Sequence, residues 1–88
     1  MVRASVPADV TSGSRGLEWA MARLRQAIEV APWDLHARFL LAKTLERLGH
    51  VEEALAVLIE IIRLDPNNLP ARRAIRQLRA GGRERKDD

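Results

Sequence analysis

The sequence contains no cysteine, so a disulfide framework and a metal site built from thiolates are both excluded. Aromatic residues are almost as scarce, since the chain has two Trp, one Phe and no Tyr. The hydrophobic fraction of 47% must therefore come mainly from Leu, Ile, Val and Ala. Gly and Pro are few and separated, and they interrupt stretches rich in Ala, Leu, Arg and Glu, which favour helices. The composition predicts an all-α domain of packed helices.

No apolar run approaches the roughly 18 to 20 residues that a membrane-spanning helix needs. The first sixteen residues also lack the apolar segment of a secretory signal. We therefore expect a cytoplasmic protein that does not contact a membrane. Residues 1–16 show no helical periodicity, which predicts a flexible N-terminal leader. A chain of 88 residues then has room for one small domain.

Apolar residues recur at three- and four-residue spacing along four segments, which predicts amphipathic helices at residues 17–31, 35–48, 52–64 and 70–80. Pro32 and Pro66 mark two breaks, and Gly49 is placed to end a helix in the left-handed conformation. Because the connections are short, neighbouring helices are expected to be antiparallel. The Gly81-Gly82 pair is expected to end the last helix. The predicted helical domain therefore spans residues 17–80, and residues 81–88 form a charged tail.

The pattern repeats with a period of 34 residues, the separation of Pro32 and Pro66. Pairs in this register are Glu18 and Glu52, Ala20 and Ala54, Leu24 and Leu58, Ile28 and Ile62, and Ala37 and Ala71. The central unit carries Leu41-Ala42, Leu45, Gly49, Glu52-Glu53-Ala54, Leu58 and Pro66. A helical hairpin of this period and pattern resembles the tetratricopeptide repeat family.

The resemblance implies a short α-solenoid of antiparallel helical hairpins with about four helices. It covers one full repeat with a half-repeat on each side, which is below the three repeats usually needed for stability. It also implies a non-catalytic protein-interaction or scaffold module.

In the family, the first helix of each repeat lines a concave groove that holds a partner peptide. The residues at the matching places are His36, Phe39, Lys43, Glu46, Arg47, Arg73 and Gln77. This surface would be basic with one aromatic ring, which suits an acidic segment or a C-terminal carboxylate. The alternative is that these are ordinary solvated charges on a helix face.

The third predicted helix is apolar over more than half of its circumference, and the first helix lacks the neighbour that a preceding helix would supply. The sequence therefore predicts an exposed apolar patch and self-association, most simply as a dimer. The residues assigned to this interface are Trp19, Leu24, Val57, Ile59 and Ile61. The alternative is a compact monomer in which Val57 and Ile59 are partly exposed.

The last helix is strongly basic, with Arg72, Arg76 and Arg79 followed by Arg83. Nucleic acid is the competing partner class, through phosphate contacts. A solubilising cap is the interpretation we favour, because no nucleic-acid motif or cluster of stacking aromatics accompanies the arginines. His36 and His50 are isolated, so the sequence predicts neither an enzyme nor a cofactor or metal site. A designed or excised repeat with no ligand of its own is a third interpretation.

Overall fold

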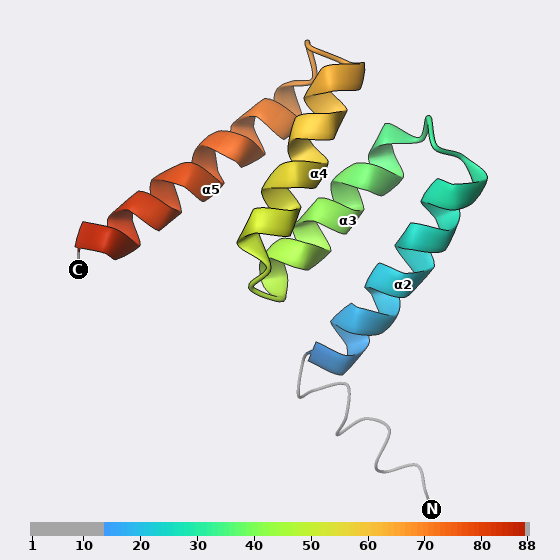
Figure 1. Cartoon of the computed structure of the whole chain (residues 1–88), viewed down its shortest axis with the longest axis horizontal. Helices are drawn as coiled ribbons and strands as arrows, with labels where there is room; N and C mark the ends of the chain where they lie inside the picture. Colours follow the sequence, from blue (N-terminus) through green and yellow to red (C-terminus); the bar gives the residue numbers. More distant parts are fainter. Residues whose placement is uncertain (1–13, 88) are drawn as a thin grey trace, which may run out of the picture.

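The computed structural model describes the backbone of residues 14–87 and the side chains of residues 15–81. It consists of four helices, α2 (Ser14–Val30), α3 (Leu35–Arg47), α4 (Val51–Leu64) and α5 (Leu69–Asp87) (Figure 1). No strand occurs among the described residues, so the prediction of an all-α fold is confirmed. The predicted leader lies mainly outside the described residues. Its end differs from the prediction, because α2 begins at Ser14 and not at Leu17.

Each helix packs against the next one along the chain, and consecutive helices run in opposite directions (Figure 1). One core cluster joins α3, α4 and α5 through Ala42, Leu58, Ile61, Ala71 and Ala74. A second cluster joins α3 and α4 through Leu41, Leu45 and Ala54, and it is covered from α2 by Met21, Leu24 and Ile28. Small alanines in both clusters allow the helix backbones to approach closely, while the larger aliphatic side chains fill the space between them.

Two equivalent turns connect α2 to α3 and α4 to α5. The Asp34 carboxylate accepts a hydrogen bond from the Ala37 amide at 3.1 Å, and the Asn68 side-chain oxygen accepts one from the Ala71 amide at 3.0 Å. Both side chains therefore cap the helix that follows, as their position in the sequence predicts. Further along each helix, an arginine donates back to the carbonyl of the turn proline.

The turn between α3 and α4 depends on Gly49, whose φ is +88°. The Gly49 amide donates to the Glu46 carbonyl at 3.0 Å, and the His50 amide donates to the Leu45 carbonyl at 2.8 Å. This pair of bonds is the Schellman arrangement, in which a left-handed residue directly after the helix satisfies its last carbonyl groups. The chain consequently reverses within a few residues, and α4 returns along α3.

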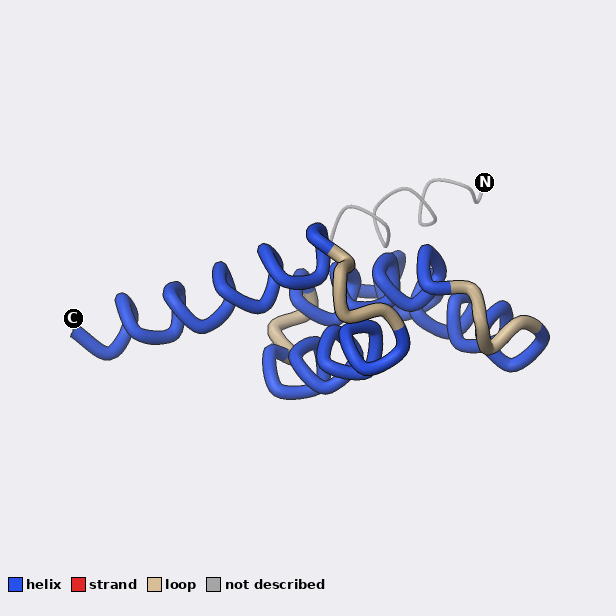
Figure 2. The backbone as a smooth tube through the Cα atoms, turned by 90° about the horizontal axis from the view of Figure 1, so that it is seen from above, coloured by secondary structure: helices blue, strands red, loops and turns tan. Residues whose placement is uncertain are grey.

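The predicted end of the last helix at Gly81-Gly82 is wrong, because α5 continues to Asp87. In the 34-residue register, Gly49 corresponds to Arg83, so α5 has no glycine at the place where α3 turns. Glycine inside a helix costs about 1 kcal/mol relative to alanine, but it does not by itself end the helix. Seen from above, the C-terminal half of α5 projects away from the other helices (Figure 2).

Candidate functional site

The predicted groove residues of α3 lie along one side of the helix. His36 and Arg47 are exposed, whereas Phe39 and Lys43 are half-buried. Phe39 packs against the core cluster that joins α3, α4 and α5. The ring is therefore held in a fixed position while part of it still reaches solvent.

Lys43 has two partners on its own helix. Its Nζ lies 6.0 Å from the centroid of the Phe39 ring and 3.1 Å from Oε1 of Glu46. The first distance is at the outer limit of a cation–π contact, and the second is that of an ion pair. Glu46 therefore offsets the charge of Lys43, and the surface is less basic than its count of cations indicates.

Arg73 and Gln77 are exposed on α5. The helix that carries them shares a core cluster with α3, and α4 supplies Leu58 and Ile61 to the same cluster. The structure thus places the two halves of the predicted groove on helices that share a core. Arg47 and Arg73 make no ion pair with any described residue, so their charges are available to a ligand.

The residues assigned to self-association do not form a single exposed surface. Trp19 is 65% exposed. The guanidinium of Arg23 lies over its ring, 5.1 Å from the ring centroid. Ile59 is 40% exposed, while Leu24 and Val57 are half-buried against the core clusters.

The assignment of Ile61 to an exposed interface is wrong, because its side chain is completely buried within the chain. The reason is that α4 lies between α3 and α5, and side chains from both helices join Ile61 in one core cluster. Most of the apolar arc on α4 is covered in the same way. Ile59 and Leu64 are the large hydrophobic residues of α4 that remain well exposed.

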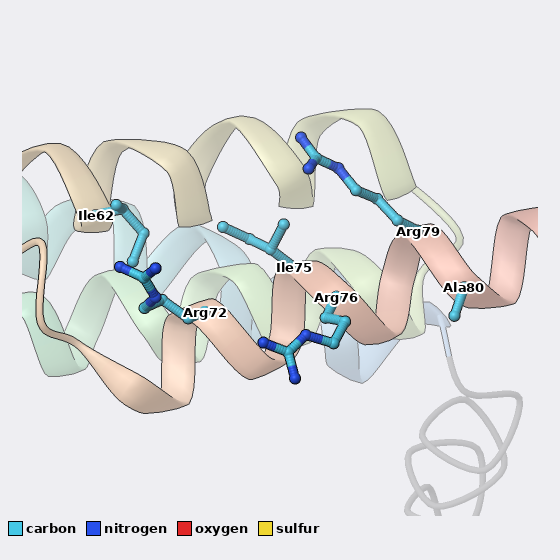
Figure 3. A pocket seen from close by; sticks show the side chains of 6 residues that line it. All are labelled: Ile62, Arg72, Ile75, Arg76, Arg79 and Ala80. Atoms are coloured by element: carbon cyan, nitrogen blue, oxygen red, sulfur yellow. The ribbon is translucent and has the colours of Figure 1, made fainter.

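Three of the four predicted basic-patch residues border one groove beside α5. It has a volume of about 540 Å³ and is lined by Ile62 of α4 and by Arg72, Ile75, Arg76, Arg79 and Ala80 of α5 (Figure 3). Arg72 also donates from a terminal guanidinium nitrogen to the Pro66 carbonyl at 2.8 Å. The side chain of Arg83 lies outside the described residues. The patch therefore combines an apolar floor with positive charge, a combination that the list of arginines alone did not predict.

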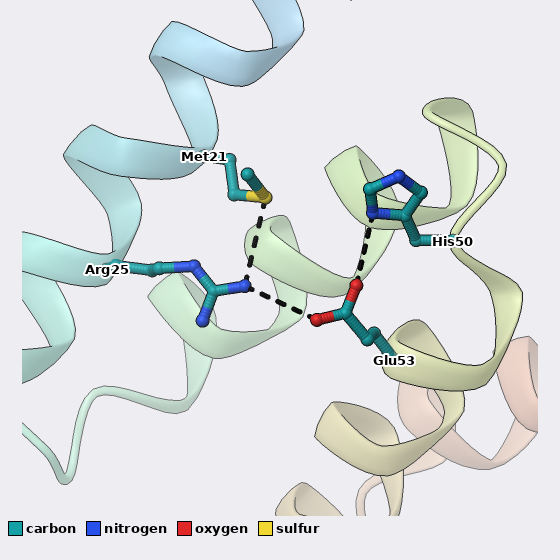
Figure 4. A network of polar contacts seen from close by, with 4 residues as sticks. All are labelled: Met21, Arg25, His50 and Glu53. Carbon is teal, nitrogen blue, oxygen red and sulfur yellow. Dashed lines mark hydrogen bonds and ion pairs between the residues drawn. The ribbon is translucent and has the colours of Figure 1, made fainter.

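A polar network that sequence reasoning missed joins α2 to the start of α4 (Figure 4). The Glu53 carboxylate lies 3.1 Å from Nδ1 of His50 and 3.9 Å from the Arg25 guanidinium, which also approaches the Met21 sulfur at 3.8 Å. His50 precedes α4 without capping it through its side chain, as its residue type predicts. These exposed pairs contribute little to stability, and the pair of Arg25 with Glu53 is one contact between α2 and α4.

Among the described side chains, those of residues 15–81, no group of three or more His, Asp or Glu is placed to hold a metal ion. None of the helices described is long and apolar enough to cross a membrane. The surface of α3 and α5 and the groove beside α5 both combine exposed arginines with partly buried apolar side chains.

Residues 18–79 match the model of a family described as tetratricopeptide repeat. The matched region begins in α2 and ends in α5, so it includes every helix packed in the two core clusters. Comparison with curated proteins and with solved structures finds no match.

Proposed function

The chain belongs to the tetratricopeptide repeat family, and we propose that it is a non-catalytic interaction scaffold that holds an acidic partner segment against α3 and α5. Modules of this family generally bind other proteins and are not catalysts. The observation that carries the proposal is the set of Phe39, Arg47 and Arg73 on two helices that share a core. An aromatic ring held in place, together with arginines that have no ion pair, is suited to a peptide that carries both apolar and acidic side chains.

The cations on this surface differ in whether they already form an ion pair. Arg47 and Arg73 have no ion pair among the described residues, so a carboxylate can bind either guanidinium without first breaking a contact. Lys43 can bind a carboxylate only in competition with Glu46. A ligand carboxylate is therefore expected to prefer the arginines, while an apolar side chain next to it contacts Phe39.

Nuclear magnetic resonance titration of the labelled chain tests this proposal. The probes are one short acidic peptide with a free C-terminus and a peptide of the same length in which Lys replaces each acidic residue. The acidic peptide should shift the amide signals of α3 and of the first half of α5. Changing Arg47 and Arg73 together to Ala should weaken its binding about tenfold or more, because two charge-assisted contacts are lost.

Arg63→Ala is the matched control, since Arg63 is an exposed arginine of α4 that is paired with Glu60. This variant should bind the acidic peptide as the unchanged chain does. Equal binding of the acidic and basic peptides, or no effect of the double change, would show that these charges only solvate the surface.

Self-association is a second proposal, which is favoured by the incomplete cover of α2. In the 34-residue register Leu24 corresponds to Leu58, and Leu24 is half-buried where Leu58 is only 1% exposed. Ala27 is exposed where its counterpart Ile61 is fully buried. No helix precedes α2 among the described residues, and in a two-fold dimer α2 of a second copy could supply the missing cover.

Light scattering over a concentration series tests this second proposal. The unchanged chain should increase in mass with concentration, and Trp19→Ala combined with Ile59→Glu should remain a monomer with the same helical content. Both side chains are exposed, so neither change should disturb the fold. A folded monomer at every concentration would contradict self-association and leave the proposal for α3 and α5 intact.

A further inference from the structure

The groove beside α5 has a counterpart one repeat earlier in the same chain. The earlier groove is lined by Ile28, Arg38 and Leu41, together with Arg25, Glu29 and Val57. The first three residues lie 34 positions before Ile62, Arg72 and Ile75, which line the groove beside α5. The two grooves are thus the same feature of two successive repeats.

The earlier groove shows which helix covers the equivalent surface in the preceding repeat. Its volume is about 330 Å³, compared with about 540 Å³ beside α5. The earlier groove includes Val57 of α4, because α4 folds back along α3. Beside α5, the lining residues come only from α4 and α5 themselves. The structural repeat therefore identifies the missing element as a helix that is antiparallel to α5, as α4 is to α3.

The chain does not fold back to supply this helix from the residues described. Whereas α3 ends at Arg47, α5 continues to Asp87, six residues beyond Gly81, which corresponds to Arg47. The C-terminal part of α5 extends away from the other helices and does not turn back along them (Figure 2).

Two residue differences between α3 and α5 determine which side chains the missing helix must carry. Where α3 has Ala42, α5 has Arg76, and where α3 has Leu45, α5 has Arg79. Ala42 and Leu45 are 1% and 0% exposed because α4 covers them. Arg76 and Arg79 are exposed and form no ion pair with a described residue. An apolar helix placed here would bury two uncompensated charges, which is strongly unfavourable.

A second copy of this chain does not fit these charges. In the 34-residue repeat, α2 is the equivalent of α4, so α2 of a second copy would occupy the place of the missing helix. Val57 of α4 then corresponds to Arg23 of α2. Arg23 would therefore enter the groove next to Arg76 and Arg79, where like charges repel. Nucleic acid fits less well than a helix, because the floor consists of Ile62 and Ile75 and no aromatic side chain lines the groove for base stacking.

We propose that the groove beside α5 docks an acidic amphipathic helix of a partner protein, antiparallel to α5. Its apolar side chains pack on Ile62 and Ile75, and its carboxylates pair with Arg76 and Arg79 (Figure 3). Leu45, the counterpart of Arg79, shares a core cluster with Ala54 of α4. The docked helix therefore carries an acidic residue at the place equivalent to Ala54.

The chain itself provides the probe for a test. The apolar probe is a fluorescent peptide of residues 50–65, and the acidic probe is the same peptide with Ala54→Glu and Ile61→Glu. Fluorescence anisotropy measures the binding of each probe to the full chain. The unchanged chain should bind the acidic probe about tenfold or more tightly than the apolar probe, and salt should weaken the acidic complex more than the apolar one.

The reciprocal variant is Arg76→Ala combined with Arg79→Leu, which gives α5 the residues of α3 at these two places. This variant should prefer the apolar probe, so the order of affinities is reversed. Arg23→Gln is the control, because it removes one positive charge from α2 outside the groove. It should bind the acidic probe as the unchanged chain does.

Three outcomes would overturn the proposal. The first is equal binding of both probes by the unchanged chain. The second is an order of affinities that the reciprocal variant leaves unchanged. The third is tighter binding of a single-stranded DNA than of the acidic probe, lost in Arg76→Gln with Arg79→Gln, which would assign the arginines to nucleic acid. The site on α3 and α5 is tested separately, by the peptide titration in which Arg47 and Arg73 are changed together to Ala.

Discussion

The segment from Pro32 through α3 and the segment from Pro66 through α5 begin in the same way and end differently. At the beginning, Arg38 donates to the Pro32 carbonyl at 2.9 Å and Arg72 donates to the Pro66 carbonyl at 2.8 Å. The caps Asp34 and Asn68 are equivalent as well. The first half of each segment therefore encodes the same turn between hairpins.

The second halves differ at three positions near the returning helix and the turn that leads to it. Ala42, Leu45 and Gly49 in the first segment are replaced by arginines in the second segment. The first segment buries Ala42 and Leu45 and turns at Gly49, whereas the second exposes Arg76 and Arg79 and continues to Asp87. The comparison shows that the turn between hairpins and the closure of a hairpin are encoded separately.

The largest effect is expected when α3 is given the residue of α5. Leu45→Arg places a charge in a site that is fully buried between α3 and α4. The lost apolar contact alone is worth about 2–5 kcal/mol, and burial of the unpaired charge adds to it. The variant should therefore be largely unfolded by circular dichroism. Arg79→Leu, the reverse change on the exposed side of α5, should leave the urea midpoint nearly unchanged. A folded Leu45→Arg chain would mean that α4 does not depend on this contact.

Replacing glycine with alanine should change the stability of the fold in opposite directions in the two segments. An added Cβ would meet nothing within 4 Å at either Gly49 or Gly81, so the backbone conformation decides the outcome. Gly49→Ala forces alanine into the left-handed region and should destabilise the fold by about 1–2 kcal/mol. Gly81→Ala should stabilise α5 by up to about 1 kcal/mol, since alanine is the better helix former. Urea unfolding measures both, and effects of the same sign would contradict the difference between the two ends.

Much of the first half of each segment, which contains the turn and the start of the helix, could be predicted from the sequence. The reason is that caps and turn prolines act over three or four residues. Asp34, Asn68 and Gly49 all have the roles that their residue types indicate. The predicted end of α5 is wrong because the prediction uses the presence of Gly81 and Gly82 and not their position in the 34-residue repeat. Comparing Gly49 with Arg83 would have shown that Gly81 and Gly82 stand too early to close a hairpin.

The burial of Ile61 and the groove beside α5 depend on how helices pack, and periodicity along one helix does not show this. A broad apolar arc on α4 indicates two buried sides, but it does not tell whether a second chain or α5 covers the second side. The structure shows that α5 does so. Similarly, the contact of Glu53 with Arg25 joins residues of different helices, and no spacing in the sequence predicts it, whereas its contact with His50 is a local i,i+3 pair.

The two helix caps should be interchangeable, since both turns have the same geometry. Asp34→Ala and Asn68→Ala each remove the acceptor of one amide hydrogen bond and should each cost about 1 kcal/mol. Asp34→Asn and Asn68→Asp should restore most of this loss. Thermal unfolding of the four variants measures the effect. A much larger loss at one cap would indicate that its turn has a second role.

The smallest effect is expected from the arginines that close the two turns. Arg38→Ala and Arg72→Ala each remove one hydrogen bond to a proline carbonyl, which is worth about 0.5–1.5 kcal/mol. The two losses in stability should be similar, because the bonds have nearly the same length. Their consequences for binding should differ, since Arg72 also lines the groove beside α5 and Arg38 lies in the groove that α4 already narrows. Urea unfolding and anisotropy with the acidic probe separate the two roles. Equal loss of binding in both variants would mean that the change acts through the turn and not through the groove.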